Sequence, residues 1–302
     1  MKRILLILAV FLCGAPAFAQ LKHVAITERA HALVGPLGNR DFANLGNNAT
    51  FGVVVTNDGV VLIDAGGTRE GAKQIDRAID RFTDLPVRIV INSGGQDHRW
   101  LGNSYWAEQG ARIIASEAAV LDQTDRASLQ LTILDQLVGD MGLNGTEILH
   151  ATETFADEMN FTFGGVSFEI RHAPAHTPGD SYTWVPSENT VFTGDIVYTK
   201  RLLGVVPVSN TRDWLASFEA FEALHAEHVV PGHGNPTDIL EAATSTYDYL
   251  SNLREQIGAH IETGGTIMDA AQVDQSGFAH LYNFDILSGR NAQAVFEEME
   301  WD

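Results

Sequence analysis

Short apolar runs alternate with polar turns along most of the chain, in the pattern typical of a mixed α/β protein. Residues 51–55 and 60–63 are two apolar, β-branched runs on either side of an Asp-Gly turn, and they predict a β-hairpin. From Glu70, apolar side chains recur on one helical face until Pro86 ends the pattern. The continuous apolar run 87–91 then predicts a buried strand.

The same alternation continues to the C-terminal part of the chain. Residues 111–115 predict a strand, and Ser116 with Glu117 predicts the start of a helix that reaches about Val138. Further strands are predicted at residues 161–163, 166–173, 181–185 and 190–193. Helices are predicted at residues 211–224 and 236–257.

Two β-rich halves, each accompanied by helices, indicate two sheets packed face to face with helices outside. The predicted fold is therefore a four-layer αββα sandwich of the α/β class. Because no Pro- or Ser-rich linker separates the halves, residues 20–302 are predicted to form one domain with a C-terminal helical extension from about residue 236.

The N-terminus has the organisation of a secretory signal. Lys2 and Arg3 form a basic start, residues 4–13 are apolar, and the segment Ala17-Phe18-Ala19 is typical of a cleavage site. The apolar run is shorter than the roughly 20 residues of a membrane-spanning helix. We therefore expect residues 1–19 to be a signal peptide and the mature protein to be periplasmic or secreted.

Composition limits the partners and the chemistry. The chain has 19 basic and 39 acidic residues, a formal charge of −20, which disfavours nucleic acid and anionic membranes as partners. The single cysteine, Cys13, lies in the predicted signal, so any metal must be held by histidines and carboxylates. We expect the partner to be a small-molecule substrate; the sequence leaves the oligomeric state open.

Residues with the chemistry of metal ligands follow several predicted strands. Asp97 and His98 are adjacent, and the preceding glycines allow an irregular turn in which both side chains converge. Three further candidates stand in Gly- or Pro-rich segments at strand ends: His176, Asp195 and His233. Loops at strand ends are the usual place for a functional site on a rigid scaffold.

With these segments in this order, the sequence resembles the metallo-β-lactamase-fold hydrolase superfamily from about Phe51 to His233. The resemblance implies the αββα fold, a site for one or two metal ions that is usually filled by zinc, and hydrolysis of esters, amides, thioesters or related bonds. It assigns metal binding to Asp97, His98, His176, Asp195 and His233. It also places Asp64 at the first motif, where we expect this side chain to orient the loop around the metal.

The second motif departs from the family pattern His-x-His-x-Asp-His, because Ser93 and Gly95 stand where the two leading histidines would be. In the family these histidines and the counterpart of His176 hold the first metal. The remaining ligands belong to the second site, so we expect one zinc ion per chain. Iron or manganese would suit the same ligand types.

The predicted catalytic residues are Asp97 and His176. Asp97 would help hold the metal, and His176, released from the first site, would act as general base or orient the substrate. Arg99 and Trp100 are predicted to form a surface ion pair and a core aromatic residue, respectively. Asn92 and Gln96 are poor substitutes for the missing ligands, because neutral amides bind zinc weakly.

Two classes of function follow from these residues. The first is an exported metal-dependent hydrolase; the alternative is a catalytically silent binding or accessory protein that kept the fold and lost two ligands. Within the first class, no residue selects a lactam, as a true β-lactamase would require. Hydrolases that serve periplasmic oxidation of sulfur compounds or alcohols also share this layout. The substrate therefore stays open at the level of sequence.

Overall fold

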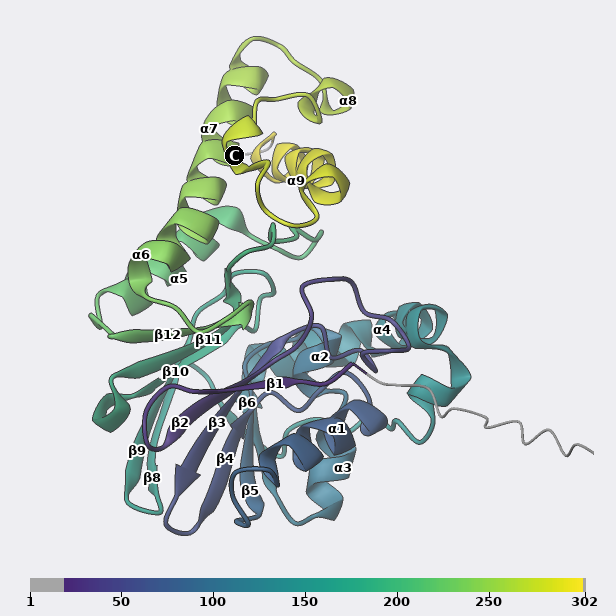
Figure 1. The fold of residues 1–302 in the computed structure, drawn as a ribbon. Helices are drawn as coiled ribbons and strands as arrows, with labels where there is room; N and C mark the ends of the chain where they lie inside the picture. The colour runs from purple at the N-terminus through teal and green to yellow at the C-terminus, as the bar shows by residue number, and fades with distance from the viewer. Residues whose placement is uncertain (1–18, 301–302) are drawn as a thin grey trace, which may run out of the picture.

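The computed structural model describes residues 19–300. The predicted signal peptide lies outside the described residues apart from its last residue, Ala19. Two β-sheets lie side by side in the lower part of Figure 1, and a helical C-terminal part rises above them.

The first sheet has seven strands in the order β1-β2-β3-β4-β5-β6-β7. Their bounds are β1 Lys22–Ala25, β2 Ala30–Val34, β3 Thr50–Thr56, β4 Gly59–Ile63, β5 Val87–Asn92, β6 Arg112–Ser116 and β7 Glu153–Phe155. Strands β1 to β4 pair antiparallel, and β4 to β7 pair parallel. The predicted hairpin is confirmed, since Thr56 pairs with Gly59 across its turn.

The second sheet has five strands in the order β12-β11-β10-β9-β8. Their bounds are β8 Glu158–Phe163, β9 Val166–His172, β10 Ser181–Val185, β11 Thr190–Tyr198 and β12 His228–His233. Strands β11 and β12 pair parallel, and the register shifts on both sides of Gly194. Strand β11 is longer than predicted, so Asp195 lies within it rather than after it.

Nine α-helices are present among residues 19–300, most of them on the outer sides of the two-sheet sandwich. Their bounds are α1 Arg69–Ile79, α2 Asp97–Trp100, α3 Asn103–Glu108, α4 Glu117–Leu143, α5 Thr211–Glu222, α6 Ile239–Ala242, α7 Asp248–Glu262, α8 Ile267–Ala270 and α9 Phe284–Met299. Short 3-10 segments occur at Pro186–Glu188 and Ser276–Phe278, and a π-helical turn at Ala243–Tyr247. None of the described helices is both long and apolar enough to cross a membrane.

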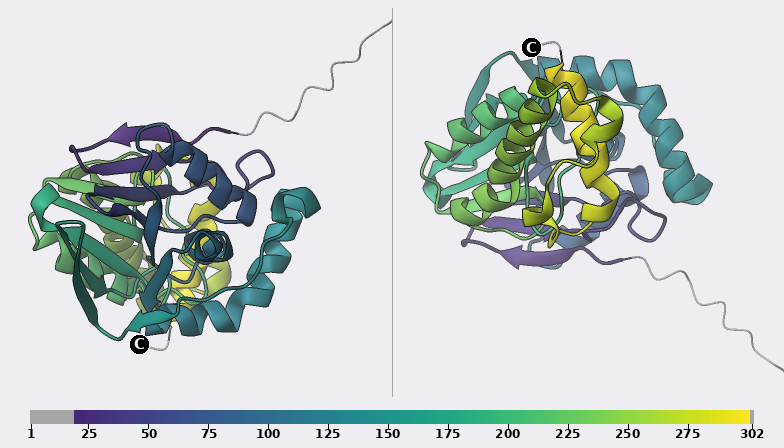
Figure 2. Two further views of the ribbon diagram at one scale, coloured as in Figure 1. Left: turned by 90° about the horizontal axis from the view of Figure 1, so that it is seen from below. Right: turned by 90° about the horizontal axis from the view of Figure 1, so that it is seen from above.

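Three buried apolar clusters lie between neighbouring layers of the fold and hold them together. One lies between the sheets, where Ile63 and Ile91 of the first sheet are buried with Phe168 and Phe192 of the second. A second cluster packs α1 on the outer face of the first sheet, and a third packs α5 and α7 on the outer face of the second sheet. The two views in Figure 2 show helices on both outer faces. The predicted αββα sandwich is confirmed.

Local signals account for several helix boundaries. The Ser116 hydroxyl accepts a hydrogen bond from the Ala119 amide and caps α4 as predicted. The predicted end at Val138 coincides with Gly139, whose φ of 69° interrupts the helical backbone. The long helix predicted over residues 236–257 is present as a continuous helical stretch over residues 239–262, with a π-helical turn between α6 and α7.

Candidate metal centre

The predicted site residues come from both sheets. His98 lies on the single turn of α2, directly after β5 of the first sheet. Asp195 and His233 lie on the neighbouring strands β11 and β12 of the second sheet, and His176 is in the connection between β9 and β10. All four side chains are buried. The site therefore lies where the two sheets meet.

His98, Asp195 and His233 form a compact group in which the candidate ligand atoms all lie within 4.8 Å of one another. The Nε2 atom of His98 is 3.3 Å from Asp195 Oδ2, and the Nε2 atom of His233 is 3.2 Å from Asp195 Oδ1. His176 is slightly farther away, with its Nδ1 atom 3.9 Å from Asp195 Oδ2. One carboxylate thus faces three imidazole rings.

The hydrogen bonds of two rings fix where their protons are. His233 Nδ1 lies 2.9 Å from the carbonyl oxygen of Asn48, and His98 Nδ1 lies 3.1 Å from Asp97 Oδ1. Because both partners are acceptors, each Nδ1 carries the proton and each Nε2 directs a lone pair at Asp195.

Two lone pairs directed at a carboxylate repel it unless a cation lies between them. His98 Nε2 and His176 Nδ1 are also buried and have no hydrogen-bond partner in the described part of the chain. Imidazoles oriented by a carbonyl and a carboxylate are common around protein-bound zinc. The donor set formed by His98, Asp195, His233 and the nearby His176 therefore fits a metal ion.

Asp97 lies next to this group but is not one of its three members. One of its carboxylate oxygens accepts a hydrogen bond from the His98 amide at 2.8 Å, and the other pairs with Arg40. Burial alone would raise the pKa of Asp97, but the charge of Arg40 and the hydrogen bond from His98 outweigh burial and hold that pKa well below its usual range. In this arrangement Asp97 orients His98.

The prediction of a surface ion pair for Arg99 is wrong, because this side chain is fully buried. Its guanidinium donates to both carboxylate oxygens of Asp195, at 2.6 and 3.1 Å, and to Asp64 at 2.7 Å. It also reaches the carbonyl oxygen of Gly232 at 3.0 Å. A buried guanidinium requires such partners, since an unpaired charge in the interior is costly. Trp100 is a buried core aromatic residue, as predicted.

Asp64 connects Arg99 to the second motif. Its two oxygens accept hydrogen bonds from the Ser93 amide at 2.8 Å and the Ser93 hydroxyl at 2.9 Å. The serine at the position of the first family histidine therefore anchors Asp64 and is not one of the three residues of the group around Asp195. Burial raises the pKa of Asp64, although the charge of Arg99 opposes the shift.

Carboxylates fill the space beside the two glycines of the second motif. A Cβ atom built on Gly95 would lie 1.7 Å from Asp122 Oδ2, and one built on Gly94 would lie 2.1 Å from Asp180 Oδ1. Asp122 in turn pairs with Arg126 on the next turn of α4. A histidine at position 95 would collide with this ion pair. Position 95 therefore has no space for an imidazole in this arrangement.

The two amides considered as substitute ligands are engaged elsewhere. Asn92 and Asn103 exchange two hydrogen bonds of 2.9 Å, and Asn92 also donates to the Arg99 carbonyl. The Gln96 amide donates to Asp97 at 3.2 Å.

Burial sets the charge state of the imidazoles. It lowers the pKa of His176 to about 4, against the opposing effect of Asp195. It lowers the pKa of His233 well below the usual value as well. Burial would raise the pKa of Asp195, but the charge of Arg99 opposes burial, and the pKa of Asp195 lies well below its usual value. At neutral pH, His176 and His233 are therefore neutral beside a carboxylate.

Three residues near the group were not predicted from the sequence. The ring of Tyr198 stacks on that of His233 with centroids 4.6 Å apart, and Arg40 pairs with Asp97. Arg201 lies with its Nη1 atom 3.5 Å from His233 Nδ1. No signal in the sequence pointed to them, because none stands in a motif and each reaches the site only through the packing of its loop or strand.

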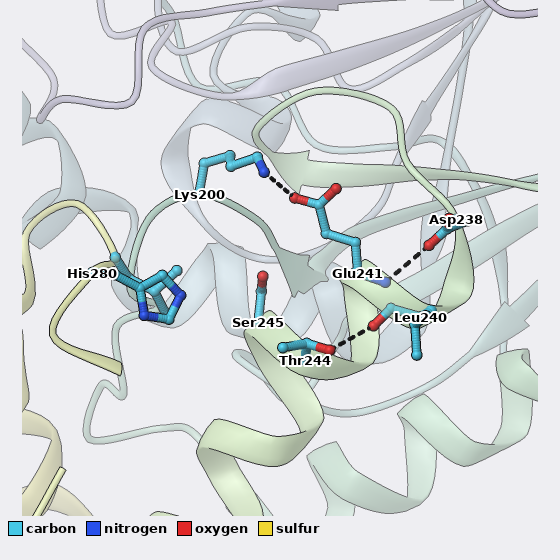
Figure 3. A pocket seen from close by; sticks show the side chains of 8 residues that line it. Lys200, Asp238, Leu240, Glu241, Thr244, Ser245 and His280 are labelled. Atoms are coloured by element: carbon cyan, nitrogen blue, oxygen red, sulfur yellow. Dashed lines mark hydrogen bonds and ion pairs between the residues drawn. The ribbon is translucent and has the colours of Figure 1, made fainter. Parts of the chain in front are cut away.

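A separate pocket of about 430 Å³ lies near α6 and the π-helical turn, where Lys200 pairs with Glu241 at 2.5 Å (Figure 3). Its lining residues are Lys200, Asp238, Leu240, Glu241, Thr244, Ser245, His280 and Leu281. They include none of the candidate ligands.

Comparison with known proteins places these observations in context. Residues 46–233 match the family model of the metallo-beta-lactamase superfamily. A linear primary-alkylsulfatase of Pseudomonas sp. is 22% identical over 235 residues, which cover 66% of this chain and 44% of that protein. The chain thus spans less than half the length of this relative.

Solved structures show the same fold at low identity. A metallo-beta-lactamase from Pontibacter korlensis has a TM-score of 0.60 at 20% identity and covers 77% of this chain and 100% of its own. The stereoselective inverting sec-alkylsulfatase Pisa1 from Pseudomonas sp. has a TM-score of 0.71 at 14% identity, covering 92% of this chain and 50% of its own. These similarities show the fold of the chain.

Proposed function

The chain belongs to the metallo-beta-lactamase superfamily, and from that membership we propose that it is an exported, metal-dependent hydrolase of a small-molecule substrate. The observation that carries the proposal is that the Nε2 atoms of His98 and His233 lie 3.3 and 3.2 Å from the two carboxylate oxygens of Asp195. Such a group has the donor types and the closeness that a single zinc ion requires.

His98, Asp195 and His233 would hold the metal, with His176 as the fourth candidate ligand. Asp97 keeps His98 in the tautomer whose Nε2 atom is free to bind, and Asn48 does the same for His233. A bound zinc ion supplies Lewis acidity, which polarises the bond to be broken and lowers the pKa of water. Iron or manganese would serve the same ligand set.

His176 is the candidate proton acceptor if it stays off the metal. Burial keeps its imidazole neutral at neutral pH, and its Nδ1 atom has no partner in the described part of the chain. A neutral, unpaired imidazole next to the metal ligands can accept a proton from the attacking nucleophile. Arg99 has a positioning role, because it holds both oxygens of Asp195 in place.

A screen of hydrolytic substrates, combined with a metal assay, tests this function. The relatives include proteins named alkylsulfatases and metallo-beta-lactamases, so the screen contains alkyl sulfates and lactams beside lactones, thioesters and phosphoesters. We expect turnover that a chelator abolishes, that zinc restores and that His233→Ala eliminates in a folded protein. Turnover unaffected by the chelator and by His233→Ala would contradict the proposal.

A catalytically silent binding protein is the second candidate. Arg99 already pairs with Asp195, and Arg40 already pairs with Asp97, so both carboxylates have cationic partners without a metal. This candidate predicts that no metal remains bound after dialysis against a small excess of zinc, and that no substrate in the screen is turned over.

Export is tested on the protein from its native cell. We expect the mature protein in the periplasmic or secreted fraction, with an N-terminus near Gln20. A cytoplasmic protein that starts at Met1 would contradict this part of the proposal.

A further inference from the structure

Two histidines lie next to each other on the first sheet, on strands that contribute no residue to the candidate metal centre. His23 is on the edge strand β1 and His31 is on the neighbouring strand β2 (Figure 1). In the antiparallel register His31 lies opposite Ala25, two residues from His23, so both imidazoles are on the same side of the sheet. Nε2 of His23 lies 3.2 Å from Nδ1 of His31. The fold thus brings together two nitrogens that can bind a metal ion.

Contacts with the rest of the fold hold the two rings in place. The ring of Phe82 stacks on that of His23 with centroids 4.1 Å apart, and its centroid lies 4.8 Å from that of His31. The His31 ring also forms a hydrogen bond with the backbone of Glu28. His31 is 9% exposed, whereas His23 is an exposed residue. The pair is therefore fixed in orientation and can be reached from solvent at His23.

The charges around the pair favour a cation. Burial lowers the pKa of both histidines, so both rings are neutral at neutral pH, which is the state that binds metal ions. The negative charge of Glu188 acts on His31. Lys22 and Arg29, the nearby basic residues of the chain, donate to asparagine side chains instead.

The distance between the two nitrogens suits two ligands of one ion. With metal–nitrogen bonds of about 2.0–2.1 Å, neighbouring ligand nitrogens are about 2.9 Å apart in square-planar and about 3.3 Å apart in tetrahedral coordination. The observed 3.2 Å lies between these values. In the metal-free pair one ring donates a proton to the other. Binding an ion requires the donor ring to carry that proton on its other nitrogen, a change of tautomer that releases no proton.

We propose that His23 and His31 form a second metal site, which takes a copper(II) ion. Copper(II) binds nitrogen ligands more tightly than the other divalent ions of the first transition row, so two imidazoles with water in the remaining positions suffice. Zinc sites use three or four protein ligands, and we do not expect this pair to retain zinc. The proposal is independent of the proposed function, because neither histidine belongs to the group around Asp195.

Copper binding is measured by isothermal titration calorimetry, with copper(II) chloride as the probe and the metal-free mature chain in the cell. The double variant His98→Ala/His233→Ala removes the candidate metal centre from the count. In this background we expect one copper ion per chain, with the electron paramagnetic resonance signal of nitrogen ligands. Adding His31→Gln should weaken binding at least about tenfold, since even the hydrogen-bond partners of metal ligands contribute that much. Adding His280→Gln, which removes an exposed histidine of the separate pocket, should leave the affinity unchanged.

His31→Gln also distinguishes the pair from the N-terminal amine, because the variant keeps that amine. Unchanged affinity in a folded variant would assign the copper to the amine or to another group and overturn the proposal. Absence of saturable binding, or binding without the nitrogen signal, overturns it too. Circular dichroism and the melting temperature show whether each variant is folded.

Two further comparisons keep the test decisive if a variant does not fold. In place of the double variant, the wild-type chain is titrated, and the copper bound per chain must fall by one in His31→Gln. In place of His31→Gln, the exposed His23→Gln is used, with the same tenfold loss expected. Unchanged copper binding in either comparison overturns the proposal.

Discussion

The guanidinium of Arg99 binds both carboxylate oxygens of Asp195, through Nη2 at 2.6 Å and through Nε at 3.1 Å. Arg99 follows β5 of the first sheet and Asp195 lies in β11 of the second, so this buried pair joins the two sheets at the candidate metal centre. The contact is part of the scaffold that holds Asp195 between the imidazoles.

Replacing Arg99 should destabilise the protein more than any surface arginine does. Arg99→Met leaves the buried carboxylates of Asp64 and Asp195 without their cation, which should lower the free energy of unfolding by about 3–5 kcal/mol. Urea unfolding measures this change. Arg112→Met, which removes an exposed pair with Glu153, should cost less than about 1 kcal/mol. Equal effects of the two substitutions would show that the Arg99 pair does not contribute as described.

Metal content should follow the group around Asp195. We expect close to one zinc ion per chain by elemental analysis after dialysis against a small excess of zinc, and a large loss in His98→Ala and in His233→Ala. The exposed His280 lines the separate pocket, so His280→Ala is a control that should keep the metal. Two ions per chain, or full occupancy in both ligand variants, would contradict a mononuclear site at these residues.

Gly95 should not tolerate a side chain. In Gly95→Ala the new methyl group meets Asp122 at 1.7 Å, so the Asp122–Arg126 pair must move, and we expect a loss of about 1–3 kcal/mol in the free energy of unfolding. The double variant with Asp122→Ala should recover part of this loss. Gly277→Ala places its methyl group in open space and is the control. Equal stability of the two single variants would contradict the crowding at Gly95.

The metal-free protein should lose stability as the pH falls from about 6.5 to 4. Burial lowers the pKa of His176 from 6.5 to about 4 in the folded state. Above pH 6.5 the ring is neutral in both states, and between these values the unfolded chain takes up a proton that the folded chain does not. The contribution reaches at most about 3 kcal/mol at pH 4.

Urea unfolding of the chelator-treated protein at several pH values checks this effect. In His176→Gln the loss of stability between pH 6.5 and 4 should be smaller by the contribution of His176, whatever the stability of the variant at pH 7. The same dependence in both proteins would assign the acid sensitivity to other groups.

More of the fold than of the candidate site could be predicted from the sequence. The αββα layers and most strands could be predicted because apolar periodicity reports burial directly. The motif residues predicted five ligands, of which the structure brings His98, Asp195 and His233 into one group. The burial of Arg99 could not be predicted, since it depends on Asp64 and Asp195, which are 35 and 96 residues away in the chain. No local pattern indicates such a partnership.

The same limit applies to the glycines of the second motif and to the helical stretch formed by α6 and α7. The missing histidines were visible in the sequence, but the ion pair that fills the space beside Gly95 comes from α4, which only the packed structure brings there. The π-helical turn between α6 and α7 is an extra residue in an otherwise continuous helical pattern, and apolar spacing does not reveal it.

The bond from Arg99 to the carbonyl of Gly232 spans 133 residues of chain, and the bond to Asp195 spans 96. Contacts between such distant residues require closure of a long loop, which costs chain entropy, and they slow folding. The guanidinium acquires its full set of partners only after β12, which contains Gly232, has joined β11. A chain truncated before residue 228 would lack β12 and would have Arg99 without one of its acceptors. The candidate metal centre therefore cannot assemble before β12 is available to the rest of the fold.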